Sequence, residues 1–318
     1  MALIRFALKR LAVSAGLLLA VSFLIFGLLQ LAPGSVLTTL LGGEDASEEQ
    51  IAALTREYRL DEPIMVQYWN WLERAVHLDF GRSLRSHTPA LARIGEFAPV
   101  SGQLAALTLV LVAAVGIPAG VLAGLRRGGT TDRLTSFVAV IGMSSPPFAT
   151  GILLIYVFGV GLGAPVFGAG DAGIDRFEHL VLPAITLAIV LVAIVIRQTR
   201  AAVLDISRQD YVTFADARGL RTGRVLGRYV LRNSALPVVN TMGLIVVQLA
   251  AGTVLVESVF SLQGIGTLMV DSVEAKDIPV IQALGLLIAV VVVLTNLLVD
   301  LVALLVDPRL RLGGRTSP

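Results

Sequence analysis

LVLPAITLAIVLVAIVI (180–196) and LPVVNTMGLIVVQLAAGTVLV (236–256) are two uncharged, strongly apolar runs in the second half of the chain. A helix needs about 20 mostly apolar residues to cross a lipid bilayer. Between the two runs lies RQTRAAVLDISRQDYVTFADARGLRTGRVLGRYVLRNSA (197–235), with eight arginines and three aspartates. The sequence therefore predicts two membrane-spanning helices joined by a large basic loop.

Outward from this region, four further apolar runs complete a set of six predicted spans. Hydrophobic residues make up 55% of the 318-residue chain and charged residues 15%, against about 25% charged residues in soluble domains. These numbers exclude an ordinary soluble enzyme and predict an all-α integral membrane protein with six transmembrane helices. The predicted spans are 11–31, 97–125, 134–161, 180–196, 236–256 and 280–306.

The first span also resembles a secretory signal, because Arg5, Lys9 and Arg10 precede it. The hydrophobic part of a signal peptide has only about 7–15 residues, whereas the uncharged stretch here continues over 11–43. We therefore expect a retained helix.

Basic and acidic residues lie on opposite sides of these spans. Segments on the N-terminal side hold 17 Lys and Arg but five Asp and Glu, whereas the opposite segments hold eight and 17. Lys and Arg collect in cytoplasmic loops, so both termini are predicted to be cytoplasmic, in a bacterial-type inner or plasma membrane.

The expected organisation has four parts. They are the N-terminal end and first helix (1–43), an extracytoplasmic segment (44–96), a five-helix core (97–306) with the cytoplasmic loop 197–235, and a cytoplasmic tail (307–318). In the extracytoplasmic segment, Tyr68, Trp69 and Trp71 predict a helix on the outer membrane surface, since such rings prefer the headgroup level. It is either an interfacial anchor or a dock for an external partner.

Several kinds of chemistry have no support in the sequence. The chain has no cysteine and three histidines, so a thiolate or histidine-rich metal site is not expected. Its two lysines, Lys9 and Lys276, do not complete a Walker A loop, and no G-x-S-x-G or H-E-x-x-H pattern occurs. We expect no catalytic residue, metal ion or cofactor in this chain.

Three features inside the spans suggest structural roles. Gly116, Gly120 and Gly124 form a small-residue stripe for close helix packing. The sequence Ser-Ser-Pro-Pro at 144–147 predicts a kink in the third span. Asp300, the acid well inside a predicted span, is expected to pair with an arginine or to accept a hydrogen bond between helices.

The basic loop is larger than a connection between two membrane helices requires. Its pattern predicts a short helix from Asp210 that ends at Gly219, and a second basic helix over 221–232 that stops near Pro237. Contact with lipid phosphates is one explanation of its arginines.

The same loop carries a resemblance to a known family. YVTFADARGL (211–220), with Pro237 downstream of Gly219, resembles the EAA loop of ABC-importer permease subunits, in the longer form of the dipeptide, oligopeptide and nickel branch. Thr213-Phe214-Ala215 stands at the Glu-Ala-Ala positions. RLDEPIMVQYWNWLERAVHLDFGRSL, GVLAGLRRGGTTDR, HLVLPAITLAI, ESVFSLQGIGTLMVDSVEAKDIPVIQA and NLLVDLVALLVDPRLR resemble other segments of that branch, in the same order.

This resemblance implies a type I ABC-importer-like permease. Two homologous permease subunits would form the pathway for di- or oligopeptides, an extracytoplasmic solute-binding protein would deliver them, and one or two separate ATPase subunits would bind ATP and Mg²⁺. Membrane lipid is the other expected partner, and nucleic acid is not expected. By position, the resemblance implies an ATPase-coupling element that consists of Asp210, Tyr211, Ala215, Asp216, Gly219 and Leu220.

Two alternatives remain at this stage. The same architecture could import nickel chelates or another small solute. An ion-coupled secondary transporter, from a different class, should show inverted repeats with broken helices in corresponding positions. A membrane-embedded hydrolase has still less support, because no nucleophile and base are found together in the spans.

Overall fold

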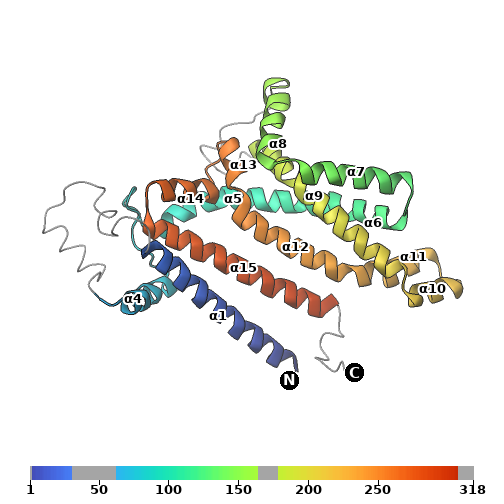
Figure 1. Ribbon diagram of the computed structural model, residues 1–318, viewed down its shortest axis with the longest axis horizontal. Coiled ribbons are helices and arrows are strands. Elements are labelled where there is room, and N and C mark those ends of the chain that lie inside the picture. Colours follow the sequence, from blue (N-terminus) through green and yellow to red (C-terminus); the bar gives the residue numbers. More distant parts are fainter. Residues whose placement is uncertain (1, 31–61, 164–177, 307–318) are drawn as a thin grey trace.

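The computed structural model describes residues 2–30, 62–163 and 178–306, and these residues form helices and short connections without a β-strand. The long helices lie roughly along one direction (Figure 1). The helical segments in the first half are α1 (Ala2–Gln30), α4 (Ile64–Val76), α5 (Ala90–Leu111), η1 (Val112–Gly116), α6 (Ile117–Leu125), α7 (Thr130–Ser144), α8 (Pro147–Leu154) and η2 (Ile155–Val160). Those in the second half are α9 (Glu178–Ser207), α10 (Asp210–Ala217), α11 (Thr222–Arg224), η4 (Val225–Leu231), α12 (Arg232–Gly252), α13 (Val254–Val259), α14 (Ile265–Glu274) and α15 (Ile278–Val306).

The described residues contain five helical segments long and apolar enough to cross a membrane, and a sixth if α7 and α8–η2 count as one bent span. This agrees with the six spans predicted from the sequence. The five are Lys9–Leu28, Ala90–Leu125, Glu178–Ser207, Thr222–Gly252 and Ile278–Val306.

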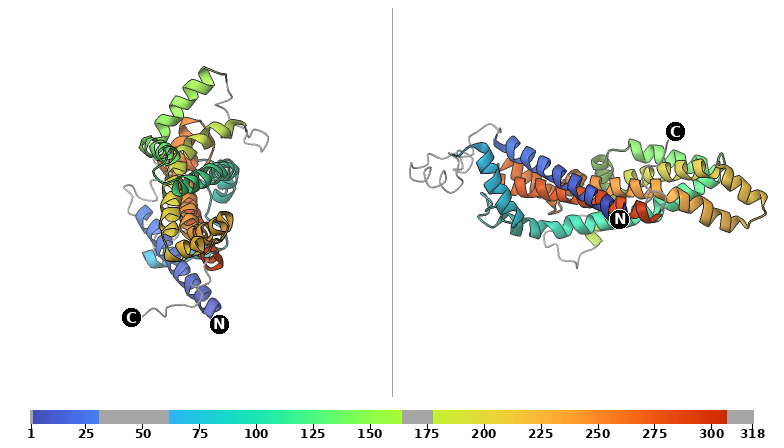
Figure 2. Two further views of the ribbon diagram at one scale, coloured as in Figure 1. Left: turned by 90° about the vertical axis from the view of Figure 1, so that its right-hand side faces the viewer. Right: turned by 90° about the horizontal axis from the view of Figure 1, so that it is seen from below.

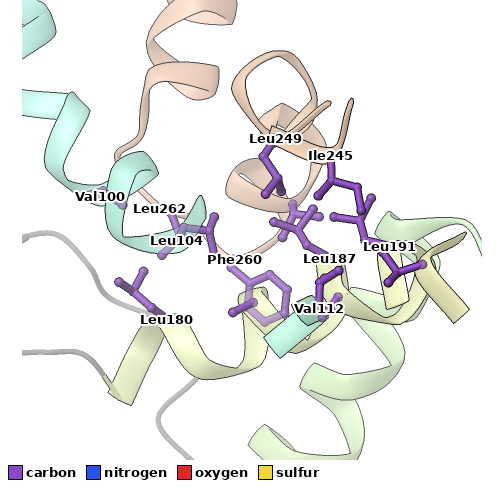
Figure 3. Packing of buried hydrophobic residues seen from close by; sticks show 14 residues of the cluster. Val100, Leu104, Val112, Leu180, Leu187, Leu191, Ile245, Leu249, Phe260 and Leu262 are labelled. Atoms are coloured by element: carbon purple, nitrogen blue, oxygen red, sulfur yellow. The ribbon is translucent and has the colours of Figure 1, made fainter. Parts of the chain in front are cut away.

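Helix α9 lies at the centre of the bundle, in contact with α5, α6, α7, α8 and α12. Its most apolar stretch is 56% buried, compared with 6–28% for the other four segments. A buried cluster fills the space beside it, in which Leu187 and Leu191 of α9 meet Leu104 of α5, Ile245 of α12 and Phe260 (Figure 3). Close packing matters here because lipid is as apolar as leucine, so dispersion and shape complementarity hold membrane helices together.

The predicted glycine stripe lies where η1 and α6 pack against α9. A Cβ on Gly120 would be 2.6 Å from the Cβ of Thr199, and Gly116 and Gly124 face Val195 and Val203 of α9 in the same way. The expectation that these glycines permit close approach is confirmed.

The break between α7 and α8 is larger than the predicted kink. The two helices meet at about 100°, and the view along the bundle shows α8 standing out from it (Figure 2). Ser145 and Pro146 are both extended, with ψ of 116° and 130°. Each of them precedes a proline, which disfavours the helical conformation at the preceding residue. Two consecutive extended residues therefore turn the chain.

Pro237 does not end a helix, contrary to the prediction. Helix α12 continues through it. Side chains close to the proline bond the backbone, since the Ser234 hydroxyl donates to the Val230 carbonyl (2.7 Å) and Thr241 to the Pro237 carbonyl (2.9 Å). Neither bond replaces the one that Pro237 removes, because a proline leaves the carbonyl four residues earlier, here that of Asn233, without its helical donor. Membrane helices tolerate this loss where the proline is packed inside a helix bundle.

The aromatic segment forms α4, but its rings are not all at a surface. Tyr68 and Trp71 are each 5% exposed and pack against Phe26 of α1, and the Tyr68 hydroxyl lies 2.9 Å from that of Ser22. Trp69 is 59% exposed. The interfacial placement therefore fits one of the three rings, because the other two join α4 to α1.

Candidate functional site

The candidate site is the loop 197–235, at the end of the molecule opposite α4 (Figure 1). Helix α9 continues to Ser207, well past Ile196, where the apolar run was predicted to end its span. At 1.5 Å per residue, this extension is about 16 Å long. Helix α10 follows after two residues, so the candidate coupling element is attached directly to the central helix of the bundle.

Two backbone hydrogen bonds define the end of α10. The Gly219 N–H donates to the Asp216 carbonyl (2.9 Å), and the Leu220 N–H to the Ala215 carbonyl (3.3 Å). This pair of bonds is the Schellman motif, in which the C′ residue is left-handed. Gly219 has φ of +71°, which costs glycine nothing. The prediction that α10 ends at this glycine is confirmed.

The inner face of α10 packs against the rest of the loop. Val212 and Ala215 are each 4% exposed, in a cluster with Val203 of α9 and with Val225 and Val230 of η4. Leu220 is partly buried against the same cluster. Ala215 and Leu220, two of the predicted site residues, therefore hold α10 in place and do not face outward.

The outer face of α10 carries two aromatic rings. Tyr211 is 41% exposed and Phe214 is 67% exposed, while Asp210 and Asp216 are also exposed. The structure thus brings the six predicted residues together in one element. It adds Phe214, which sequence reasoning placed at a Glu-Ala-Ala position and left out. The spacing of Val212 and Ala215 could have indicated it, because residues three apart share a helix face.

An ion pair links the start of α7 to the part of α9 that belongs to this loop. The Arg200 guanidinium donates through Nη2 to Oδ2 of Asp132 at 3.0 Å, and through Nε to Oδ1. Asp132 is 4% exposed and also accepts from the Gly128 N–H at 2.9 Å. The connection between α6 and α7 is therefore fixed to α9 before α10 begins.

A buried acid that the sequence analysis missed lies at the other end of α12. Glu257 of α13 has no exposed surface. Its carboxylate accepts hydrogen bonds from the Ser101 hydroxyl (2.6 Å), the Thr253 hydroxyl (2.8 Å) and the Thr267 N–H (3.1 Å). Gly264 packs so close to the carboxylate that no Cβ would fit. This cluster joins α5, α13 and α14.

Residues 116–312 match the family described as the inner membrane component of binding-protein-dependent transport systems, and residues 3–94 match the N-terminal region described for such membrane components. The chain belongs to this family. The expected resemblance to ABC-importer permeases is thereby confirmed, and the ion-coupled carrier loses its support.

Relatives cover nearly the whole chain. A probable peptide ABC transporter permease of Sinorhizobium fredii is 36% identical over 310 residues, which are 96% of this chain and 99% of the relative. A putative peptide permease of Brucella ovis is 37% identical over 326 residues (97% and 99%). The glutathione transport system permease protein GsiC of Escherichia coli is 36% identical over 310 residues (97% and 99%).

Among solved structures, the inward-facing MetNI methionine ABC transporter resembles this chain with a TM-score of 0.51 and 17% sequence identity. The likeness covers 65% of this chain and 94% of the other. The likeness concerns the fold alone and confirms the expected type I importer-like fold.

Proposed function

We propose that this permease subunit forms, with a second homologous permease subunit, a pathway for di- or oligopeptides. A solute-binding protein outside the membrane delivers the peptide, and one or two separate ATPase subunits supply the energy. In this arrangement ATP and Mg²⁺ bind on the ATPases, which carry out the hydrolysis. Relatives named for peptides and for glutathione, a small peptide, support this substrate class.

The coupling role rests on the exposed aromatic pair of α10. Tyr211 and Phe214 are exposed on a helix whose opposite face is anchored by Val212 and Ala215. Aromatic side chains on a rigid, one-sided helix are typical anchors for a groove on another protein. We infer that α10 inserts into such a groove on an ATPase, with both termini of the chain on the same, cytoplasmic side.

Few contacts separate the proposed ATPase contact on α10 from the helices around the pathway. Movement of α10 passes into α9, because α10 and η4 share one buried cluster with Val203. The Arg200–Asp132 ion pair then moves the start of α7 with α9. Closure of the ATPases would in this way change the arrangement of α5–α7 and α9 around the pathway.

The test is the recovery of partners with the tagged full-length chain from mildly solubilised native membranes. The key variant is Tyr211→Ala/Phe214→Ala. A matched control is Phe148→Ala/Tyr156→Ala, which removes two aromatic rings that are 46% and 69% exposed on α8 and η2. We expect wild type and control to recover ATPase subunits and a second permease, and the α10 variant to lose the ATPases but to keep the second permease.

Equal recovery of ATPases by the α10 variant would show that α10 is not the coupling element. Uptake of a labelled tripeptide, compared with a nickel chelate, tests the substrate separately. ATP-dependent uptake of nickel without peptide uptake would remove the peptide from the proposal.

A further inference from the structure

Segment η4 is a π-helical stretch of seven residues, Val225–Leu231, between the coupling loop and α12. Valines at its positions 225 and 230 are both buried, at 4% and 3% exposed. In an α-helix, residues five apart point about 140° away from each other. The i→i+5 bonding of a π-helix places them on one side. The unusual helix type therefore keeps one face of this segment inward.

Four arginines lie in or beside this segment. Arg228 belongs to η4, Arg221 and Arg224 precede it and Arg232 follows it, and all four are exposed. Within the described part of the chain, no salt bridge involves any of these four side chains. This row of guanidinium groups is therefore available to an anionic partner that is not part of the described residues.

The two arginines nearest to α12 and the two nearest to α10 lie at different distances from the bilayer. After Arg232, helix α12 is uncharged from residue 233 to its end at Gly252, which is about 30 Å of helix and matches the roughly 30 Å thickness of the hydrocarbon core. Because Arg232 and Arg228 immediately precede this stretch, we expect them in the headgroup layer, which is about 5–7 Å deep on each side. Arg224 and Arg221 lie farther out, next to α10.

We propose that Arg228 and Arg232 form a binding site for the headgroup phosphate of an anionic phospholipid. The planar guanidinium group binds a phosphate through two parallel hydrogen bonds, and it is always charged. Side chains four residues apart on one helix face are close enough to share one headgroup. The site is independent of the transported substrate and of the ATPase contact, and it anchors the base of the coupling loop to the membrane surface.

The experiment uses the full-length chain, with its copurifying subunits, in phosphatidylcholine nanodiscs that contain a trace of spin-labelled lipid. The immobilised fraction of labelled phosphatidylglycerol, relative to labelled phosphatidylcholine, gives the selectivity. The key variant is Arg228→Gln/Arg232→Gln. Its matched control, Arg221→Gln/Arg224→Gln, removes the same charge from the same row farther from the membrane.

We expect the wild type to prefer phosphatidylglycerol and the preference to weaken with salt. It should fall about tenfold in Arg228→Gln/Arg232→Gln and change less than about twofold in the control. Arg228→Lys/Arg232→Lys, which keeps the charge, should retain most of the preference. The immobilised fraction of phosphatidylcholine reports whether each variant remains folded.

Two results would overturn the proposal. One is an unchanged preference in Arg228→Gln/Arg232→Gln. The other is an equal or larger loss in Arg221→Gln/Arg224→Gln, which would assign the row to a protein partner beside α10 or to net charge alone.

Discussion

Polar groups are buried at one end of α12 and exposed at the other. At one end, the carboxylate of Glu257 is fully buried and its donors come from α5, the end of α12 and α14. At the other end, α10 has its aromatic rings and carboxylates exposed around a small buried cluster. The hydrogen bonds to the Glu257 carboxylate all come from the described chain. The exposed side chains of α10 form a surface on which another protein can bind.

This difference shows that a membrane protein can use separate regions for its own stability and for binding a partner. Burial of apolar surface does not drive helices together in lipid, so polar clusters and close packing fix the relative positions of helices. A buried charge with all its hydrogen bonds made is a strong constraint, because removal of one partner leaves the others unsatisfied. Exposed side chains carry no such constraint, so they are free to serve recognition.

The largest expected effect comes from removal of the buried acid. Glu257→Ala leaves three donors without their acceptor, namely the hydroxyls of Ser101 and Thr253 and the Thr267 N–H. Because a buried donor that loses its partner costs about 1–3 kcal/mol, we expect the free energy of unfolding to fall by about 3–5 kcal/mol, measured by denaturant unfolding of the purified chain in detergent. Glu274→Ala, at an exposed position of α14, is the control and should change little. A loss below about 1 kcal/mol, the level of an ordinary neutral hydrogen bond, would contradict the strong stabilising role that we assign to the buried Glu257.

A smaller, local effect is expected at the end of α10. Gly219→Ala places a Cβ on a residue with φ of +71°, which costs about 1–2 kcal/mol. Because nothing lies within 4 Å of that Cβ, the cost is in the backbone alone. We expect faster hydrogen exchange of the α10 amides and reduced ATP-driven uptake, with global stability nearly unchanged. Gly223→Ala, also in open space but without a positive φ, should leave both measurements at wild-type values.

The smallest effect is expected for the ion pair between α1 and α15. Nη1 of Arg10 lies 2.8 Å from Oδ2 of Asp300, and the two side chains are 48% and 25% exposed. Partly exposed pairs contribute about 0–1 kcal/mol. A double-mutant cycle of Arg10→Gln and Asp300→Asn, followed by denaturant unfolding, should give a coupling energy in this range. A much larger coupling, close to the loss expected when a buried charge is left without its partner, would place this pair in the same class as Glu257.

Features governed by local spacing could be predicted from the sequence. The apolar runs indicated the spans, and the four-residue glycine interval indicated the contact of α6 with another helix. The helix from Asp210 to Gly219 followed from a glycine at a helix end. The arginine partner expected for Asp300 is Arg10, on a helix at the opposite end of the sequence. The sequence indicated that the partner could be an arginine, but not which arginine.

Features that depend on the third dimension were missed. Glu257 directly follows an uncharged run and therefore resembled a loop residue. One of its three donors, Ser101, lies far away in sequence, on α5. Pro237 resembled a helix stop, but α12 continues through it inside the packed bundle. The Ser-Ser-Pro-Pro sequence indicated a break, but not the angle of about 100°. Phe214 was overlooked because the family pattern has a different residue there.

Helix α9 differs from several of its neighbours in the described part of the chain. The helical runs that contain α5, α8 and α12 include the π-helical segments η1, η2 and η4, whereas α9 includes none. Wider turns of this kind are points where a helix can change its winding. Pro183 interrupts the hydrogen bonding of α9 near its start, but residues 184–207 form a regular helix of about 36 Å. A displacement of α10 should therefore travel along this stretch with little loss, while the neighbouring helices change their winding at the π segments.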